Sequence, residues 1–366
     1  MEAYLIFGMG PAGLFLARQL RHHNNRAIVA IGKKDDIGRY SNTLDKYYAT
    51  EELVGIKEAV EQTIKEYDTV YPYVCSDQYL SFFFEKWPDI FNKLYFSSPD
   101  YETLRLFSDK DSLMSFCQKL NMTIPHSEYL ANSYYNGMAL AIKPLVKRGV
   151  SQMGKITVIS SGEQLKAFKQ RVVESGASLT DYIVQPFIKG NNLFEYGYGG
   201  VFENGKALVD MCFYQLRQYP QGVSCYTLEI TDPVKVSAIH QAVDVFPRQT
   251  NYTGFLQFDI KEDETTGELY VLDVNPRPWG SVSMLSSKLS SNGQLWHVKE
   301  RNKPCKWRFP LKELFSFKNR MNVPYSKIRE MRSGNNYTYL IDLIDKKDLG
   351  PFLMQPVISI IKLFKR

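Results

Sequence analysis

Four polar side chains stand at regular spacing near residue 270, and their types are suited to binding a metal-bound phosphate. They are Asp259, Asp273, Asn275 and Arg277. Carboxylate and amide oxygens are hard ligands of the kind that Mg²⁺ takes when it bridges nucleotide phosphates. An arginine beside them can pair with a phosphate or with a carboxylate. The spacing therefore predicts a site for divalent cations and phosphate, with Asp259, Asp273 and Asn275 as metal ligands.

The surrounding residues predict a β-hairpin that holds these side chains on one face. Two apolar runs, Phe255–Ile260 and Leu269–Val274, flank a turn-rich insert that contains Gly267. Each run carries an acid at a strand end, and the positions from 273 to 277 alternate along extended chain. Side chains two residues apart point to the same side of a strand. The hairpin should therefore bring Asp273, Asn275 and Arg277 to one surface.

This segment resembles the last strand pair of the ATP-grasp family. Members carry an acid and then an acid-x-Asn-x-Arg run, which here reads Asp273-Val274-Asn275-Pro276-Arg277, 14 residues after Asp259. The chain departs from the family by having Asp where Glu is usual at both acid positions. The shorter side chain draws each ligand back by one methylene, which puts metal geometry and activity in question. An ordinary hairpin with solvent-exposed acids is the alternative.

The resemblance implies an α/β fold in which a Rossmann-like pre-ATP-grasp domain precedes a two-lobed α+β ATP-grasp domain. We expect the first at residues 1–100, the second at 101–298, and a basic C-terminal extension at 299–366. A chain of 366 residues with 44% hydrophobic and 23% charged residues is typical of a globular protein of this size. Its five scattered cysteines contain no C-x-x-C pair, which argues against a disulfide framework and a structural zinc site.

The N-terminus predicts a strand, a Gly-rich turn and a helix. Residues 8–13 read G-x-G-x-x-G, and Leu14, Leu16, Ala17 and Leu20 should form the buried side of the helix. A second strand at 27–31 ends in Gly-Lys-Lys without the acid that would hold an NAD ribose, although the lysines suit a 2′-phosphate. Two interpretations stay open: a packing turn, in which glycine permits close approach of helix and strand, or an NADP site.

The family resemblance also implies a set of nucleotide-binding residues. A lysine at the start of the helix that begins at Ser108, and one leaving the strand Met138–Ile142, would reach the phosphates. A loop at 147–155 would close over them. The segment Tyr182–Ile188 resembles the hinge strand that contacts adenine, with a polar residue near the ribose after it. The implied cofactor-binding residues are Lys110, Lys143, Lys155, Gln185, Phe187, Ile188 and Asn192.

An arginine after a second predicted hairpin is a further candidate. Residues 203–206 read Glu-Asn-Gly-Lys, a tight-turn signal. The following segment resembles the Arg and Pro/Gly loop of ligases related to D-aspartate ligase and carbamoyl-phosphate synthase, with one glycine missing. The resemblance makes Arg217, with Arg277, a catalytic candidate that would orient an acyl phosphate or an acceptor carboxylate. A surface arginine is the alternative for Arg217.

The charge of the chain is unevenly distributed. Residues 299–366 hold sixteen Lys and Arg against six Asp and Glu, a local +10, whereas the whole chain carries +6. Such asymmetry favours contact with an anionic surface. The last helix is too short to span a bilayer, and peripheral membrane contact is favoured over docking on the protein's own surface or a partner subunit. No leader, 18-residue apolar run or aromatic-basic repeat is found, so we expect a cytoplasmic protein without a nucleic-acid partner.

The function implied is ATP-dependent carboxylate–amine ligation through an acyl phosphate, with two Mg²⁺ ions and ATP as cofactors. The acceptor would be an amino acid or a precursor of the cell wall or a surface glycan. No Ser-His-Asp or Cys-His constellation suggests a protein nucleophile. Two other functions stay open: an NADP-dependent oxidoreductase that uses the Gly-rich turn, and an ATP-binding protein without activity.

Overall fold

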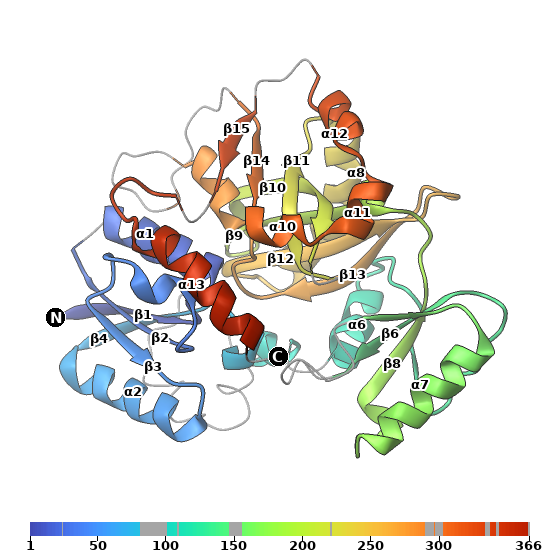
Figure 1. Cartoon of the computed structure of the whole chain (residues 1–366), viewed down its shortest axis with the longest axis horizontal. Helices are drawn as coiled ribbons and strands as arrows, with labels where there is room; N and C mark the ends of the chain where they lie inside the picture. The colour runs from blue at the N-terminus through green and yellow to red at the C-terminus, as the bar shows by residue number, and fades with distance from the viewer. Residues whose placement is uncertain are drawn as a thin grey trace.

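The computed structural model describes most of the chain, and the account below concerns that part. Three sheets make up the molecule, and helices cover them (Figure 1). The described residues are 1–23, 25–80, 101–107, 110–145, 156–219, 222–289, 296, 303–333, 337–341 and 344–364.

The N-terminal region is a four-stranded parallel sheet with order β3-β2-β1-β4 and a helix packed on each face. Alternate residues of its central strands pack against α1 on one side and α2 on the other. Such strands read as continuous apolar runs because both faces are covered. The predicted Rossmann-like start is confirmed, including the buried side of the first helix. The elements are β1 (Glu2–Phe7), α1 (Pro11–His23), β2 (Ala27–Gly32), η1 (Ile37–Tyr40), β3 (Lys46–Ala49), α2 (Leu53–Glu66) and β4 (Thr69–Val74).

The second region is a four-stranded antiparallel sheet, order β5-β8-β6-β7, with α7 packed on it through Leu165, Phe168 and Val172. It forms the smaller of the two lobes that the sequence predicts after the N-terminal domain. Its elements are β5 (Glu128–Tyr129), β6 (Leu140–Pro144), β7 (Thr157–Ile159), α7 (Gly162–Glu174), η2 (Leu179–Asp181) and β8 (Tyr182–Pro186). Two helices precede it in the chain: α5 (Tyr101–Arg105) packs with the N-terminal region through Leu104, and α6 (Lys110–Lys119) packs with the seven-stranded sheet described next, through Leu113 and Cys117.

The third region is a seven-stranded sheet, order β13-β12-β9-β10-β11-β14-β15. Residues after 299, predicted as an extension, supply its last two strands. The elements are η3 (Asn192–Phe194), β9 (Glu195–Glu203), β10 (Lys206–Gln218), β11 (Ser224–Glu229), α8 (Pro233–Val243), α9 (Val245–Gln249), β12 (Gly254–Glu262), β13 (Leu269–Asn275), η4 (Val282–Ser287), β14 (Cys305–Arg308), α10 (Pro310–Leu314), α11 (Phe317–Asn322), α12 (Tyr325–Met331) and β15 (Thr338–Leu340).

The turn between β9 and β10 is the tight hairpin that the sequence predicts. Asn204 and Gly205 have φ angles of 50° and 77°, as a two-residue turn with both central residues left-handed requires. A Cβ on Gly205 would lie 2.8 Å from the carbonyl oxygen of Pro247, so glycine is also needed for space. The β12–β13 hairpin is confirmed as well, with β12 extending two residues further than predicted.

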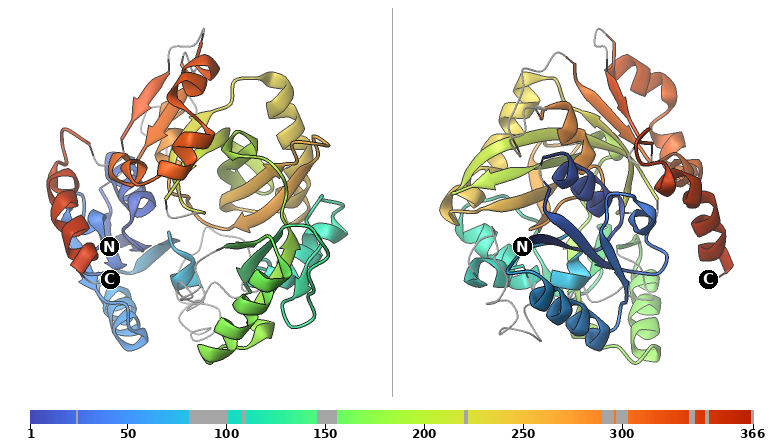
Figure 2. Two further views of the ribbon diagram at one scale, coloured as in Figure 1. Left: turned by 45° about the vertical axis from the view of Figure 1, so that its right-hand side comes forward. Right: turned by 90° about the vertical axis from the view of Figure 1, so that its left-hand side faces the viewer.

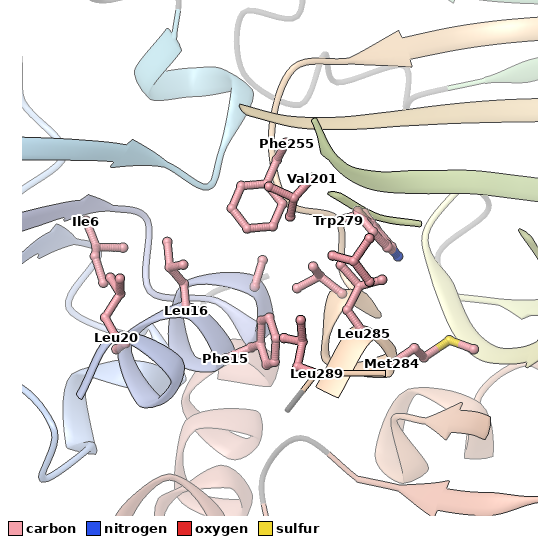
Figure 3. Close-up of a cluster of buried hydrophobic side chains, with 14 of the residues drawn as sticks. Ile6, Phe15, Leu16, Leu20, Val201, Phe255, Trp279, Met284, Leu285 and Leu289 are labelled. Atoms are coloured by element: carbon pink, nitrogen blue, oxygen red, sulfur yellow. The ribbon is translucent and has the colours of Figure 1, made fainter. Parts of the chain in front are cut away.

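One apolar cluster joins the N-terminal region to the large sheet (Figure 3). Phe15 and Leu16 of α1 lie on one side of it, while Trp279 and Leu285 follow the β12–β13 hairpin on the other. Burial of this many large apolar side chains is the main stabilising term available to such an interface. The hairpin that carries the candidate metal ligands is therefore fixed relative to the N-terminal sheet.

The C-terminal helix α13 (Gly350–Phe364) returns to the N-terminal region (Figure 2). There it packs against η1, with Ile358 buried beside Ile37. Arg18 donates to the carboxylate of Asp348 at 2.9 Å in a buried pair just before the helix. A Cβ on Gly350 would lie 2.1 Å from the carbonyl oxygen of Tyr40, so only glycine allows this approach. The structure thus shows docking on the protein's own surface, which the sequence left as an alternative, while membrane contact stays a prediction. Within the described residues, no helix has the length and hydropathy to cross a bilayer.

Candidate active site

The β12–β13 hairpin brings the three predicted metal ligands together. Asp259 lies directly opposite Asp273 in the antiparallel register, and Gln257 lies opposite Asn275. Residues opposite one another on paired strands have side chains on the same face, so all four share one surface. The predicted convergence of Asp259, Asp273 and Asn275 is therefore present, and their role as ligands stays a prediction.

Two glutamines hold the first of these acids in place. Gln215 on β10 and Gln257 on β12 donate to Oδ1 of Asp259 at 2.7 and 2.8 Å. Gln257 in turn accepts a hydrogen bond from the amide of Asn275 at 2.8 Å. The described residues offer no donor to the other carboxylate oxygen of Asp259. Sequence reasoning missed both glutamines, although each lies at an even spacing from a candidate on its own strand.

Arg277 reaches across to the N-terminal region and forms a bidentate ion pair with Asp77. Its Nε and Nη2 donate to the two carboxylate oxygens at 2.6 and 2.9 Å. Burial alone lowers the pKa of Arg277, but the charges of Asp77, Asp259 and Asp273 outweigh it and raise the pKa, so the guanidinium stays charged. Asp77 was not predicted. Its position just beyond the carboxyl end of parallel strand β4 is where open α/β sheets place ligand-binding groups.

The lysines predicted to reach phosphate fall into three cases. Lys110 is the first residue of α6, and its Nζ lies 3.7 Å from Oδ2 of Asp273, at the edge of the acid pair. Lys143 lies on β6 and is buried, opposite Ile183 of β8. Lys155, with the rest of the loop at 147–155 and residues 108 and 109, lies outside the described residues. Only Lys110 is thus shown near the acids.

The segment predicted as the adenine hinge joins the second sheet to the third. Gln185 lies on β8 and is buried, with its amide donating to Ser127 Oγ at 2.8 Å. The chain then leaves the sheet, with Phe187 exposed and Ile188 half-buried. Asn192 is buried, and its amide donates to Glu195 at 3.0 Å. The connection has the position of a hinge between lobes, while contact with adenine stays a prediction.

A buried lysine beside this hinge was missed by sequence reasoning. Lys261 Nζ donates to the carbonyl of Gly190 at 2.6 Å and to Glu195 Oε1 at 3.1 Å. Burial raises the pKa of Glu195, and the ammonium of Lys261 opposes that shift. The pair ties β12, which carries Asp259, to the segment between the lobes. Its signal in the sequence was a lysine two residues after Asp259 on the same strand.

The donor set fits a magnesium ion that is shared with a nucleotide. The described residues contain no group of three or more His, Cys, Asp or Glu placed to hold a metal alone. Mg²⁺ in nucleotide sites takes one or two carboxylates and completes its shell with phosphate oxygens and water. Asp259 and Asp273 supply the two carboxylates, and the amide oxygen of Asn275 lies beside them.

Comparison with known proteins supports a fold rather than an activity. No family model matches the chain. A D-aspartate ligase from Enterococcus faecium (strain Aus0004) is 24% identical over 201 residues, which are 50% of this chain and 48% of that protein. The chain therefore spans about half the length of this curated relative.

Solved structures match over most of the chain. N5-carboxyaminoimidazole synthetase from Staphylococcus aureus has a TM-score of 0.60 at 14% identity and covers 83% of this chain and 81% of its own. L-amino acid ligase from Bacillus licheniformis has a TM-score of 0.60 at 14% identity, covering 87% and 77%. The chain has the ATP-grasp fold. The fold class predicted from the acid-x-Asn-x-Arg run is confirmed.

Within this ATP-grasp fold, Arg217 does not occupy the position expected of it. Its side chain is fully buried, and its guanidinium donates to Glu313 at 3.0 Å and to the carbonyl of Val323 at 3.2 Å. It also stacks 4.1 Å from the ring of Tyr325. A guanidinium without exposed surface cannot meet a substrate, so the catalytic role predicted for Arg217 is not supported. A register shift beside it in the β10–β11 pairing turns it away from Gln215 and toward the C-terminal helices.

The Gly-rich turn at residues 8–13 is closed by the chain itself. Asp36 accepts hydrogen bonds from the backbone N–H groups of Met9 and Lys33, both at 3.0 Å. In a dinucleotide site the N–H groups of the Gly-rich turn face the pyrophosphate, and Asp36 occupies one of them, that of Met9. A Cβ on Gly13 would lie 2.2 Å from the carbonyl oxygen of Gly8, so this glycine serves close packing of helix and strand. The structure favours the packing turn over the NADP site.

Proposed function

We propose that the protein is an ATP-dependent carboxylate–amine ligase that releases ADP and phosphate. The observation that carries this proposal is the cross-strand acid pair, Asp259 opposite Asp273, flanked by Lys110 and Arg277 on an ATP-grasp fold. When bound, ATP with Mg²⁺ supplies the phosphoryl group that turns a carboxylate into an acyl phosphate. An amine then displaces phosphate from it and forms the amide.

Different residues of the chain would contact the metal ions and neutralise the charge of the phosphates. Asp259, Asp273 and Asn275 would hold up to two magnesium ions against the phosphates. Lys110 and Arg277 supply positive charge on either side of the acids, where a preorganised site stabilises the charge that develops during transfer. Because Arg277 is held by Asp77, its guanidinium is already fixed before a substrate arrives.

We further propose that the substrates include an amino acid or an amino-acid-bearing precursor of the cell wall or a surface glycan. Support comes from the names of two proteins to which the chain is similar, a D-aspartate ligase and an L-amino acid ligase. Asp77 lies in the segment after β4 of the N-terminal sheet, and its carboxylate pairs with Arg277. The acceptor would therefore approach between the N-terminal region and the hairpin.

An ADP-release assay over free amino acids and acidic acceptors, with Mg²⁺ and ATP, tests the proposal. Asp273→Asn should lower turnover by about a hundred- to a thousandfold, since removal of one preorganised electrostatic group costs on this order. The matched control is Glu264→Gln, which removes one exposed carboxylate from the loop of the same hairpin and should leave turnover unchanged. Wild-type turnover in Asp273→Asn would refute the proposed role of the acid pair. Saturable ATP binding without turnover for any acceptor would instead favour an inactive ATP-binding protein.

A further inference from the structure

Strand β14 presents two cations on one face of the large sheet. Lys306 and Arg308 are two residues apart and share that face, while Cys305 and Trp307 are buried on the other. Lys306 lies opposite Tyr339 of the edge strand β15. The pair therefore lies one strand from the end of the sheet.

A third cation and two tyrosine rings complete this cluster. Lys306 Nζ lies 4.8 Å from the ring centre of Tyr339, and Arg308 lies 5.9 Å from the same ring. Arg332, the residue after α12, lies 5.8 Å from the ring centre of Tyr337. Burial lowers the pKa of Lys306, and the charges of Arg332 and Arg308 lower it further, so the three cations are close enough to repel one another.

The described residues neutralise only part of this charge. Glu313 pairs with Arg308, but the same carboxylate also pairs with the buried Arg217. Neither Lys306 nor Arg332 has a carboxylate partner in the part of the chain that the structure describes. Like charges held together without a counter-charge cost free energy, and an anionic ligand would relieve that cost.

The cluster is separate from the candidate active site. Gln215, which binds Asp259, lies opposite Thr227, and Thr227 lies opposite Trp307. Arg308 is next to Trp307 on its strand and therefore points to the other face of the sheet. An anion bound here would not be the phosphate tail of a nucleotide held by the acid pair.

We propose that Lys306, Arg308 and Arg332 form a second anion site, which binds a phosphate-bearing group. Arginine and lysine donors form charge-assisted hydrogen bonds to phosphate oxygens, and three of them match a group with more than one charge. Tyr339 is 44% exposed and forms one side of the site. The net charge of +10 in residues 299–366 draws such ligands to this part of the surface. The phosphate would belong either to a lipid headgroup or to a soluble precursor.

Two probes distinguish these sources. Pyrophosphate binding is measured by calorimetry with the nucleotide site saturated with ADP, and vesicle binding is measured by sedimentation with phosphatidylglycerol against phosphatidylcholine alone. The test variants are Lys306→Gln and Arg332→Gln. The matched control is Lys327→Gln, which removes the same charge from an exposed lysine of α12 that pairs with Glu330. Melting curves verify that each variant is folded, and Lys306→Arg keeps the charge if Lys306→Gln is unstable.

The proposal expects both test variants to weaken binding by about tenfold or more, as loss of one charge-assisted bond does, and the control to bind as wild type. Loss confined to pyrophosphate assigns a soluble ligand, and loss confined to phosphatidylglycerol vesicles assigns a lipid headgroup. An equal loss in Lys327→Gln would show that net charge alone attracts the anion, and would overturn the site. So would the failure of wild-type protein to bind either probe, or full binding by Lys306→Gln and Arg332→Gln.

Discussion

The Gly-rich turn of the N-terminal sheet and the β12–β13 hairpin both carry a short sequence pattern associated with nucleotide binding. They differ in how the rest of the chain contacts the polar groups of that pattern. At the turn, Asp36 accepts a hydrogen bond from the backbone N–H of Met9, one of the groups that would face a pyrophosphate. At the hairpin, Asp259 and Asp273 lie opposite each other beside Lys110 and Arg277, and the described residues offer no donor to one carboxylate oxygen of Asp259. A pattern indicates a site where its polar groups converge beside opposite charges, and it indicates packing where the chain itself occupies the groups that a ligand would bind.

The largest effect in this comparison is expected from the ion pair between Asp77 and Arg277, which links the N-terminal region to the hairpin. Asp77→Asn should lower kcat by about ten- to a hundredfold, because charge-assisted hydrogen bonds contribute about 1.5–3 kcal/mol and Arg277 would lose its orientation. The KM for ATP should change little, since Lys110 and the acids remain. Steady-state kinetics with the acceptor found by the ADP-release assay measure both constants.

The control for this pair is Glu61→Gln, which removes an exposed carboxylate from α2 in the same N-terminal region. It should leave kcat and KM unchanged. A folded Asp77→Asn protein with wild-type kcat would show that Arg277 needs no support from the N-terminal region, and the hairpin would then be sufficient by itself.

Much of the fold and part of the site follow from local patterns in the sequence. Asn204 and Gly205 specify a tight turn through their own backbone preferences, and the alternation from 273 to 277 fixes which side chains share a face. The partners of Arg277 and Arg217 do not follow, because Asp77 and Glu313 are 200 and 96 residues away. The register shift at Arg217 turns a residue with the expected spacing toward the opposite side. Long-range pairing and bulges are set by tertiary packing, which a local pattern does not contain.

Glycine substitutions in the turn provide the next test. Gly13→Ala should lower the free energy of unfolding by about 1–3 kcal/mol, because its Cβ would lie 2.2 Å from a backbone oxygen that cannot move aside. Gly10→Ala is the matched control, since a Cβ there meets no atom within 4 Å. Urea unfolding measures both. Similar stability of the two variants would contradict the packing role, and NADP binding that Gly10→Ala abolishes would restore the dinucleotide interpretation.

A smaller effect is expected from Asp36, whose carboxylate accepts hydrogen bonds from the backbone N–H groups of Met9 and Lys33. Asp36→Ala should lower the free energy of unfolding by about 1–2 kcal/mol, since two backbone N–H groups lose their acceptor. Asp36→Asn should lose less, because its amide oxygen can still accept. ADP release should be unchanged in both folded variants, as expected of a closed turn. A loss of turnover that exceeds the loss of folded protein would show that the turn contributes to the active site.

The smallest effect is expected at His240 on α8, whose two ring nitrogens lie near carboxylates of the chain itself. Its Nδ1 lies 3.1 Å from Asp244 and its Nε2 lies 3.6 Å from Asp210. The hydrogen bond to Asp244 raises the pKa of His240 above its ordinary value of 6.5, and burial only partly opposes this. A pKa raised by folding contributes stability that is fully present below the unfolded-state pKa and is lost as pH rises through the folded-state pKa. The stability difference between wild type and His240→Asn should therefore be larger at about pH 6 than at about pH 8.5 and, for a half-exposed pair, below about 1 kcal/mol. Urea unfolding at the two pH values measures this difference, and a difference that grows with pH would mean that His240 is neutral in the folded protein.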